Sequence, residues 1–194
     1  MRVNASTATG SFVILPTSFL QDNLMLSLGQ TVQGKVLCYR FLAEPCKSMR
    51  EIFNAQCSIE ELYKHVSICA PYLEVVEEMT LIEFLDFHSG FKPFLSSITS
   101  EKIVSILGLE NAVNKQIRNY SSGMKQRVKL AQSIFSDVPV VLLDEPCTNL
   151  DSVGIQLYHS LINDYCKDRM VVVSSNDEVE FSFCKEKISL TTYK

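Results

Sequence analysis

The sequence predicts an α/β fold, a mostly parallel sheet flanked by helices. Residues 139–146 (PVVLLDEP) and 170–175 (MVVVSS) are apolar almost throughout, as are strands that are buried on both faces. Segments with helical periodicity alternate with these runs, which is the order that builds a parallel sheet. The 194-residue chain is 46% hydrophobic and 21% charged, an ordinary balance for a packed globular domain. We therefore expect one α/β domain.

The first third of the chain has the least regular pattern. Residues 24–36 are interpreted as a helix followed by the start of a strand at residues 34–36. Ser58 and Glu61 match a capping box, which predicts a short helix reaching residue 65. From this point onward the predicted elements alternate clearly.

The middle of the chain contains one predicted strand and two predicted helices. Residues 65–70 (HVSICA) are typical of a buried strand. Thr80 and Glu83 form a second capping box, and the helix after it carries its apolar side chains on one face. A further helix is expected over residues 100–107, because Gly108 is a common C-terminal stop.

The last third gives the strongest signals. A helix is predicted over residues 121–135 from its serine cap and its apolar stripe, and the buried strand 139–146 follows it. Residues 151–165 form an amphipathic pattern that precedes the apolar strand at 170–175. Residues 187–190 (KISL) predict one last short strand.

Composition excludes several classes of function. The formal net charge is −4, so the chain lacks the basic balance of a nucleic-acid-binding protein. No stretch reaches the roughly 18 apolar residues of a membrane-spanning helix, and the N-terminus is too weak for a secretory signal. The seven cysteines are scattered without a CxxC pair, which favours a reducing cytosol over a disulfide framework or a zinc site.

Two adjacent carboxylates end the strand at 139–146. Ligands of open α/β sheets bind at the carboxyl ends of strands, where Asp144 and Glu145 fall. Asp144 suits holding Mg²⁺, which is bound by one or two carboxylates together with phosphates. Glu145 suits orienting or deprotonating a water molecule. The alternative is a strand that ends in a solvated acidic turn.

Three small residues precede the helix at 121–135. Ser121, Ser122 and Gly123 place hydroxyls and unpaired N–H groups at a helix N-terminus, where the helix dipole favours phosphate. A simple N-cap is the alternative for this segment alone. The phosphate interpretation gains weight because TNLDSVG follows the strand with Asp144 at once.

These three segments together resemble the nucleotide-binding subunit of ATP-binding-cassette (ABC) transporters. YSSGM, residues 120–124, is similar to the LSGGQ signature, with Ser121 and Gly123 matching. VVLLDEP resembles the Walker B strand, NLD resembles the D-loop, and VVVSSND occupies the place of the strand that ends in the switch histidine. The resemblance covers residues 58–194.

The resemblance implies a P-loop NTPase-like fold with a helical subdomain and an ABC-type ATPase that binds ATP and Mg²⁺. It implies the following roles: Asp144 as the metal ligand, Glu145 as the catalytic residue, and Ser121, Ser122, Gly123, Asp151 and Asn176 as nucleotide-binding residues.

Several positions depart from the family pattern. No segment is identified as the phosphate-binding motif GxxxxGK[ST], and residues 16–23 (PTSFLQDN) are interpreted as standing in its place. Pro71 or a neighbour takes the position of the Q-loop glutamine, and Asn176 takes that of the switch histidine. The family's opening strands are incomplete. The chain is therefore expected to have lost its own P-loop and to bind ATP weakly or through a partner.

We expect a single domain over 1–194, with a divergent or truncated part at 1–57, a helical subdomain at about 72–125 and a core at 126–194. Family architecture implies a second ATP-binding subunit and a transmembrane permease as partners, no nucleic acid, and a cytoplasmic location at the inner face of the membrane. Two alternatives stay open. The chain is a non-catalytic scaffold or regulatory remnant, or residues 1–57 reflect a truncated or frameshifted ABC ATPase.

Overall fold

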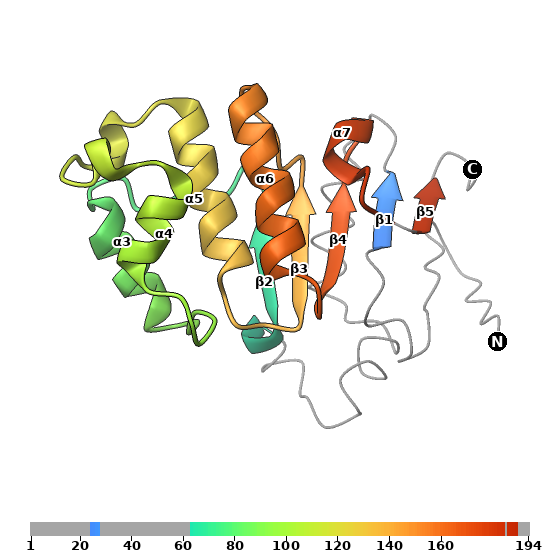
Figure 1. Cartoon of the computed structure of the whole chain (residues 1–194), viewed down its shortest axis with the longest axis horizontal. Helices are drawn as coiled ribbons and strands as arrows, with labels where there is room; N and C mark the ends of the chain where they lie inside the picture. Colours follow the sequence, from blue (N-terminus) through green and yellow to red (C-terminus); the bar gives the residue numbers. More distant parts are fainter. Residues whose placement is uncertain (1–23, 28–62, 185, 190–194) are drawn as a thin grey trace.

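The computed structural model describes residues 24–27, 63–184 and 186–189. Within them lies one parallel sheet in the order β2-β3-β4-β1-β5 (Figure 1). Its strands are β1 (Leu24–Ser27), β2 (Val66–Cys69), β3 (Val140–Asp144), β4 (Met170–Ser174) and β5 (Glu186–Ser189). The predicted α/β class and the parallel sheet are confirmed.

Strands β3 and β4 form the buried centre of the described sheet. Every residue of both strands is buried, as their apolar sequences predict. Asp144 pairs in register with Ser174, so both strands end at the same edge of the sheet. The residues that follow them, on which the predicted chemistry depends, therefore lie at one edge.

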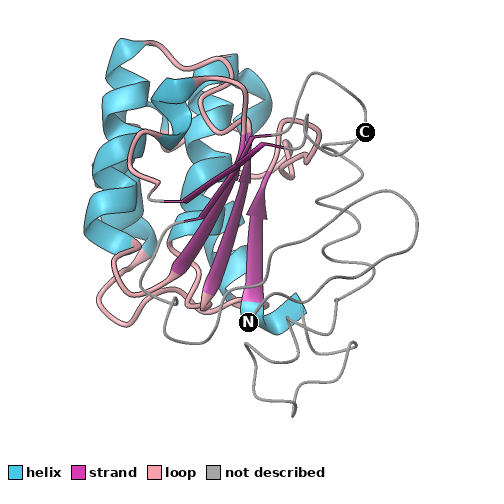
Figure 2. Cartoon of the chain, turned by 90° about the vertical axis from the view of Figure 1, so that its right-hand side faces the viewer, coloured by secondary structure: helices cyan, strands magenta, loops and turns pink. Residues whose placement is uncertain are grey.

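Two long helices, α5 (Ser122–Ile134) and α6 (Ser152–Tyr165), cover one face of the sheet (Figure 2). Their apolar side chains join those of the strands in one core, in which Tyr158 is completely buried. The Tyr158 hydroxyl donates to the Glu180 carbonyl oxygen at 2.8 Å, which ties α6 to the short helix α7 (Glu178–Phe181). No helix in the described part of the chain combines the length and the apolarity needed to cross a membrane.

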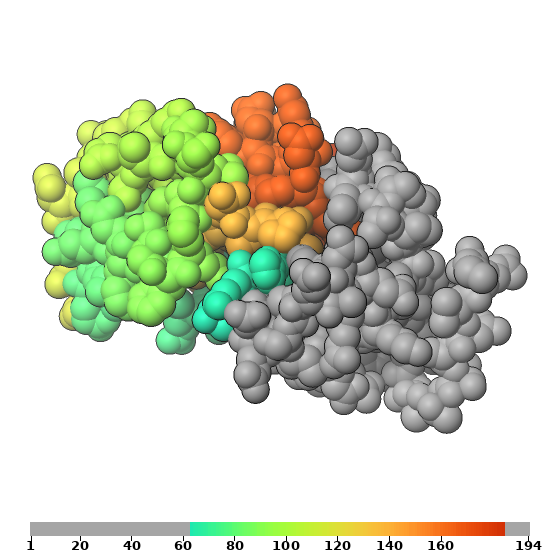
Figure 3. Space-filling view, turned by 90° about the horizontal axis from the view of Figure 1, so that it is seen from below, coloured from blue at the N-terminus to red at the C-terminus, as the bar shows by residue number. Residues whose placement is uncertain are grey.

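A helical lobe lies beyond the β2 edge of the sheet (Figures 1 and 3). It contains α3 (Leu81–Ser89), α4 (Ser100–Leu107) and the 3₁₀ helices η3 (Glu110–Ala112) and η4 (Ile117–Asn119). Thr80 and Glu83 form both halves of the predicted capping box. Gly108 ends α4 with φ 65°, a left-handed conformation that glycine adopts without steric cost.

Arg169 fastens the C-terminal ends of α5 and α6 from inside the core. Its guanidinium donates to the carbonyl oxygens of Ile134 (2.6 Å), the last residue of α5, and of Ser136 (2.9 Å), two residues beyond it. Its Nε donates to the Tyr165 carbonyl oxygen at the end of α6 (3.0 Å). A buried cation here satisfies carbonyls that have no partner within their helices.

The predicted helix from Leu24 is wrong, because residues 24–27 form strand β1 between β4 and β5. A four-residue segment with three apolar residues does not distinguish helix from strand, and here its neighbours in the sheet decide the outcome. Residues 63–65 form one 3₁₀ turn before β2. The predictions for Ser58, for residues 16–23 and for the strand starting at 34–36 lie outside the described residues.

Candidate functional site

Asp144 is held at the carboxyl end of β3 by the neighbouring strand. The Ser174 hydroxyl donates to Asp144 Oδ1 at 2.9 Å, and both side chains are buried. Asp144 is thus oriented by β4 at the edge of the sheet where the sequence predicts a metal-binding carboxylate.

Glu145 follows at once and is exposed. Its backbone has φ 44°, in the left-handed region that non-glycine residues rarely adopt. Its N–H donates to the Ser174 carbonyl oxygen at 2.9 Å, and its own carbonyl oxygen accepts from the Thr148 N–H at 3.2 Å. The chain therefore turns sharply after the buried strand and presents the Glu145 carboxylate to solvent.

Asn176 lies two residues beyond β4, at the same edge of the sheet as Asp144 and Glu145. It is exposed. The next residue, Asp177, caps α7 by accepting from the Val179 N–H at 3.0 Å. The fold thus brings three predicted site residues, Asp144, Glu145 and Asn176, to one edge.

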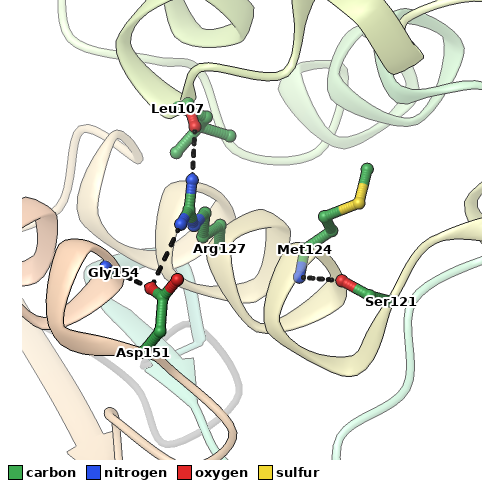
Figure 4. Close-up of polar contacts among 6 residues, drawn as sticks. All are labelled: Leu107, Ser121, Met124, Arg127, Asp151 and Gly154. Atoms are coloured by element: carbon green, nitrogen blue, oxygen red, sulfur yellow. Dashed lines mark hydrogen bonds and ion pairs between the residues drawn. The ribbon is translucent and has the colours of Figure 1, made fainter.

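The N-terminus of α5 carries the predicted phosphate-binding residues. Ser121 is its N-cap, and its Oγ accepts from the Met124 N–H at 3.3 Å (Figure 4). The hydroxyl hydrogen can still be donated, and the N–H groups of Ser122 and Gly123 belong to the helical turn that has no internal acceptor. Both serines are exposed. The arrangement can donate several hydrogen bonds to an anion.

Gly123 allows α5 to approach the loop that follows β3. A Cβ atom at this position would lie 2.9 Å from the backbone carbonyl oxygen of Asn149, a distance that Cβ atoms essentially never show. Asn149 itself has φ 64°, so this loop is locally strained where it meets the helix. The signature-like segment and the D-loop-like segment are therefore in direct backbone contact.

Asp151 connects the same two segments through its side chain. It is the N-cap of α6, with Oδ1 accepting from the Gly154 N–H at 2.7 Å. The Arg127 guanidinium from α5 lies 3.4 Å from the same oxygen and also donates to the Leu107 carbonyl oxygen of α4 at 3.3 Å (Figure 4). Arg127 thus joins α4, α5 and the start of α6.

The predicted site residues fall into two groups. One group, at the strand ends, contains Asp144, Glu145 and Asn176. The other lines a cleft of about 400 Å³ whose walls include the following residues: Ser121, Ser122, Gly123, Arg127, Asn149 and Asp151. The loop from Glu145 to Asp151 belongs to both groups. The cleft therefore lies beside the sheet edge that carries Asp144 and Glu145. Its walls include the exposed N-terminus of α5.

One acidic residue near this edge was missed by sequence reasoning. Glu180 in α7 is 5% exposed, and its Oε1 accepts from the Cys147 N–H at 2.7 Å. Burial raises the pKa of the Glu180 carboxyl, against smaller lowering effects of the Ser175 hydroxyl and the Cys147 N–H. The one sequence signal is an acid between Val179 and Phe181, four residues after Asn176. Burial also raises the pKa of the Cys147 thiol to about 12, which keeps it protonated.

The segment after β2, which includes Pro71, is tied to α5. The Lys129 ammonium donates to the Pro71 carbonyl oxygen at 2.9 Å. One helical turn earlier, Lys125 pairs with Glu77 at 2.6 Å. Lysines spaced by four residues lie on one helix face, so both hold the same segment. The segment that takes the Q-loop position is thus attached to the helix that starts at Ser121.

A second signal was missed directly after β1. The sequence from Gly29 reads GQTVQGKV, which fits the spacing GxxxxGK with Gly34 and Lys35, and has Val36 in place of the final Ser or Thr. These residues lie outside the described part of the chain. The signal was overlooked because residues 24–36 were interpreted as a helix followed by a strand, which leaves no strand in front of the glycine.

The sheet order and the acid pair at the end of β3 define an α/β domain of the P-loop NTPase type. The model of the ABC transporter family matches residues 23–148. The chain therefore belongs to the ABC transporter family.

Individual relatives agree with this assignment. The chain is 32% identical over 176 residues to the ABC transporter ATP-binding protein YhcH of Bacillus subtilis, covering 84% of this chain and 56% of YhcH. It is 25% identical over 158 residues to the bacitracin transport ATP-binding protein BcrA of Bacillus licheniformis, covering 79% of this chain and 52% of BcrA. The chain thus spans about half the length of these relatives.

Solved structures show the same fold. An ABC transporter ATP-binding protein from Pyrococcus furiosus superposes with a TM-score of 0.69 at 18% identity. The alignment covers 90% of this chain and 87% of that one. At this level of identity the likeness establishes the architecture, and the roles of residues are argued from their own geometry.

Proposed function

We propose that this chain is the ATP-binding subunit of an ABC-type transporter and that it couples ATP binding and hydrolysis to transport. The observation that carries the proposal is the sheet order. The acid pair ends β3, Asn176 follows β4, and the GxxxxGK segment follows β1, the next strand along. Parallel strands end at one edge, so β3, β4 and β1 all end at the edge where α/β sheets bind ligands.

The proposal assigns phosphate binding to residues 29–35. In the P-loop motif, backbone N–H groups of the glycine-rich loop surround the phosphates and the lysine reaches the β- and γ-phosphates. Gly29, Gly34 and Lys35 have this spacing, and the family match includes them. The earlier expectation that residues 16–23 replace the P-loop rested on a helix from Leu24. The strand observed there removes that basis.

The acid pair fits the needs of Mg-ATP. No group of three or more potential metal-ligating His, Cys, Asp or Glu side chains occurs among the described residues, so the protein holds no complete metal cage there. Mg²⁺ does not require one, because it is bound by one or two carboxylates together with substrate phosphates. When bound, Mg-ATP supplies the phosphoanhydride bond that is hydrolysed. Asp144 would hold the cation, and Val36 provides no hydroxyl to assist it.

Glu145 would act as the general base. Its carboxylate is exposed one residue beyond Asp144, which suits accepting a proton from a water molecule that attacks the γ-phosphate. Asn176, at the end of the adjacent strand, would orient the phosphate or the water through its amide. An amide cannot exchange a proton near neutral pH as a histidine can, so Glu145 would carry the proton transfer alone.

The cleft beside α5 would serve the nucleotide of a second ATP-binding subunit. Ser121, Ser122 and Gly123 offer donors to a γ-phosphate, and Asp151 fixes the adjoining loop. Donors aimed at developing negative charge are worth about 2.7–4 kcal/mol each in comparable sites, enough to control the rate at the partner's site. The chain would therefore work as a homodimer or heterodimer.

The wider assembly is also a proposal. A transmembrane permease subunit would bind at the helical lobe, which places this chain at the cytoplasmic face of a membrane. We propose a core at residues 126–194 and a helical subdomain at about 72–125, with residues 1–57 forming the divergent N-terminal part. BcrA is described by its name as a bacitracin transport protein, and the cargo of this chain is a separate question.

A second candidate function is a non-catalytic subunit that supports an active partner. Three positions favour it: Val36 in place of Ser or Thr, Pro71 in place of the Q-loop glutamine, and Asn176 in place of the switch histidine. Such a subunit would contribute only its α5 cleft to the pair. A truncated or frameshifted gene that affects residues 1–57 would account for Val36 but not for Pro71 or Asn176.

The charge-neutral substitution Glu145→Gln distinguishes the two functions. In the catalytic subunit it should lower steady-state ATP hydrolysis by at least about 100-fold while ATP affinity stays within about threefold, since only proton transfer is lost. Glu101→Gln, at an exposed residue of α4, is the matched control and should change neither quantity. Equal hydrolysis by wild type and Glu145→Gln would favour the non-catalytic function.

A further inference from the structure

The peptide bond between Pro146 and Cys147 is held from both sides by buried side chains. Gln126 in α5 donates from Nε2 to the Pro146 carbonyl oxygen at 2.8 Å. Glu180 in α7 accepts with Oε1 from the Cys147 N–H at 2.7 Å. Since the carbonyl and the N–H belong to one planar peptide unit, the two bonds fix the orientation of that plane. We call this pair of contacts the peptide clamp.

The clamp lies directly after a strained residue. Glu145 has φ 44°, and such a conformation in a non-glycine residue costs about 1–3 kcal/mol and persists only when its surroundings enforce it. The preceding side of Glu145 is fixed by its N–H bond to the Ser174 carbonyl oxygen. The following side is fixed by the clamp together with the bond from the Thr148 N–H to the Glu145 carbonyl oxygen. Without the clamp, the turn could relax and the Glu145 carboxylate would change direction.

The two halves of the clamp are themselves rigidly placed. Gln126 is 3% exposed and lies in the second turn of α5. Glu180 is anchored by the bond from the Tyr158 hydroxyl to its carbonyl oxygen, and its helix starts two residues after Asn176. The clamp therefore connects the helix that carries Ser121 with the helix that follows Asn176.

Burial of the Glu180 carboxyl carries a cost for stability. Its Oε2 is buried without a hydrogen-bond partner among the described residues. A buried polar atom without a partner costs free energy, so an apolar side chain of the same volume would avoid that cost. What an apolar residue could not do is accept the Cys147 N–H. The contact with that peptide is the feature that requires a carboxyl or amide oxygen at this position.

We propose that Glu180 is a positioning residue for ATP hydrolysis: by holding the Pro146–Cys147 peptide against Gln126, it keeps the Glu145 carboxylate directed at the attacking water. This role rests on the proposed function, because it assumes that Glu145 is the base. It adds that the orientation of the Glu145 carboxylate depends on α7, the helix after Asn176, and not only on β3, the strand that precedes Glu145.

The test compares Glu180→Met, which fills the site without an acceptor, with Glu180→Gln, which keeps one. Glu178→Gln, on the exposed side of the same helix, is the matched control. Steady-state ATP hydrolysis by the full-length chain gives kcat and KM. In parallel, NMR measures hydrogen exchange of the Cys147 amide and, in the wild type, the scalar coupling across its hydrogen bond to the Glu180 carboxyl carbon.

Glu180→Met should lower kcat about tenfold with KM for ATP within about twofold, as for a lost transition-state interaction. Cys147 exchange should accelerate at least about tenfold in the same variant, because the amide loses its acceptor. Glu180→Gln should recover kcat to within about threefold, and Glu178→Gln should match the wild type. The wild type should show the coupling, which supports the clamp even if Glu180→Met does not fold.

Three results would overturn the proposal. Absence of the coupling together with unchanged Cys147 exchange in Glu180→Gln and Glu180→Met would show that the clamp does not exist. A freed Cys147 amide with unchanged kcat would show that the clamp does not position the base. If the wild type hydrolyses no ATP, the proposed function fails and the positioning role with it, while the NMR result still reports on the clamp separately.

Discussion

Replacing Gly123 by alanine tests the contact between the signature-like helix and the loop after β3. The new Cβ atom would lie 2.9 Å from the Asn149 carbonyl oxygen, so helix and loop must separate by several tenths of an ångström. Asn149 already has φ 64° and is followed by the tightly bonded cap at Asp151, so the loop cannot easily move away.

Two opposing effects determine the change in the free energy of unfolding. Alanine stabilises a helix by up to about 1 kcal/mol relative to glycine. Overpacking in a well-packed contact costs about 1–3 kcal/mol. Because the atom that would be struck belongs to the backbone rather than to a flexible side chain, we expect the cost to prevail. The free energy of unfolding should fall by about 1–2 kcal/mol for Gly123→Ala.

Urea denaturation followed by circular dichroism measures this change, with the slope m expected to stay constant. Gly90→Ala is the matched control. Its Cβ would lie 3.3 Å from the Phe87 carbonyl oxygen, and its φ of −66° suits alanine. Its free energy of unfolding should change by no more than about 0.5 kcal/mol. A Gly123→Ala protein as stable as the wild type, or more stable, would refute the reasoning.

Three further outcomes follow from particular contacts. Arg169→Met should lower the free energy of unfolding by about 3 kcal/mol in urea titrations, because the carbonyl oxygens of Ile134 and Tyr165 lose the Arg169 donor and that of Ser136 keeps only the Val138 N–H. Burial, and secondarily Lys92, lowers the pKa of His88 from 6.5 to about 4, so the fold binds fewer protons than the unfolded chain. Stability should therefore be full above pH 6.5 and decline toward pH 4, and thermal melts of His88→Gln should show a flatter dependence. Val36→Thr should supply the missing hydroxyl and strengthen ATP binding about tenfold in Mg²⁺ but not in EDTA, by calorimetry.

The elements in the C-terminal two thirds of the chain could be predicted from the sequence, because the residues that start and end them act within a few positions. The capping box at Thr80, the glycine stop at Gly108 and the serine cap at Ser121 each satisfy backbone groups within a few residues. The apolar strands β3 and β4 are predicted by their own composition, since both faces are buried.

The errors concern features decided by distant neighbours. Residues 24–27 form a strand because β4 and β5 flank them in the sheet. Both of these strands lie more than 140 residues away in the chain. Glu180 is buried because the Cys147 N–H requires an acceptor, and nothing next to Glu180 in the sequence indicates it. The close contact of Gly123 with Asn149 likewise depends on how α5 packs against the loop.

Titration of the chain with Mg-ATP by calorimetry, alongside Lys35→Met, tests most directly that this domain binds its own nucleotide. The account predicts saturable binding by the wild type, weakened at least about tenfold by Lys35→Met, because the lysine contacts to the β- and γ-phosphates are lost. Lys167→Met, at an exposed residue between α6 and β4, should bind as the wild type does. Absence of binding by the wild type, or equal binding by wild type and Lys35→Met, would contradict the account.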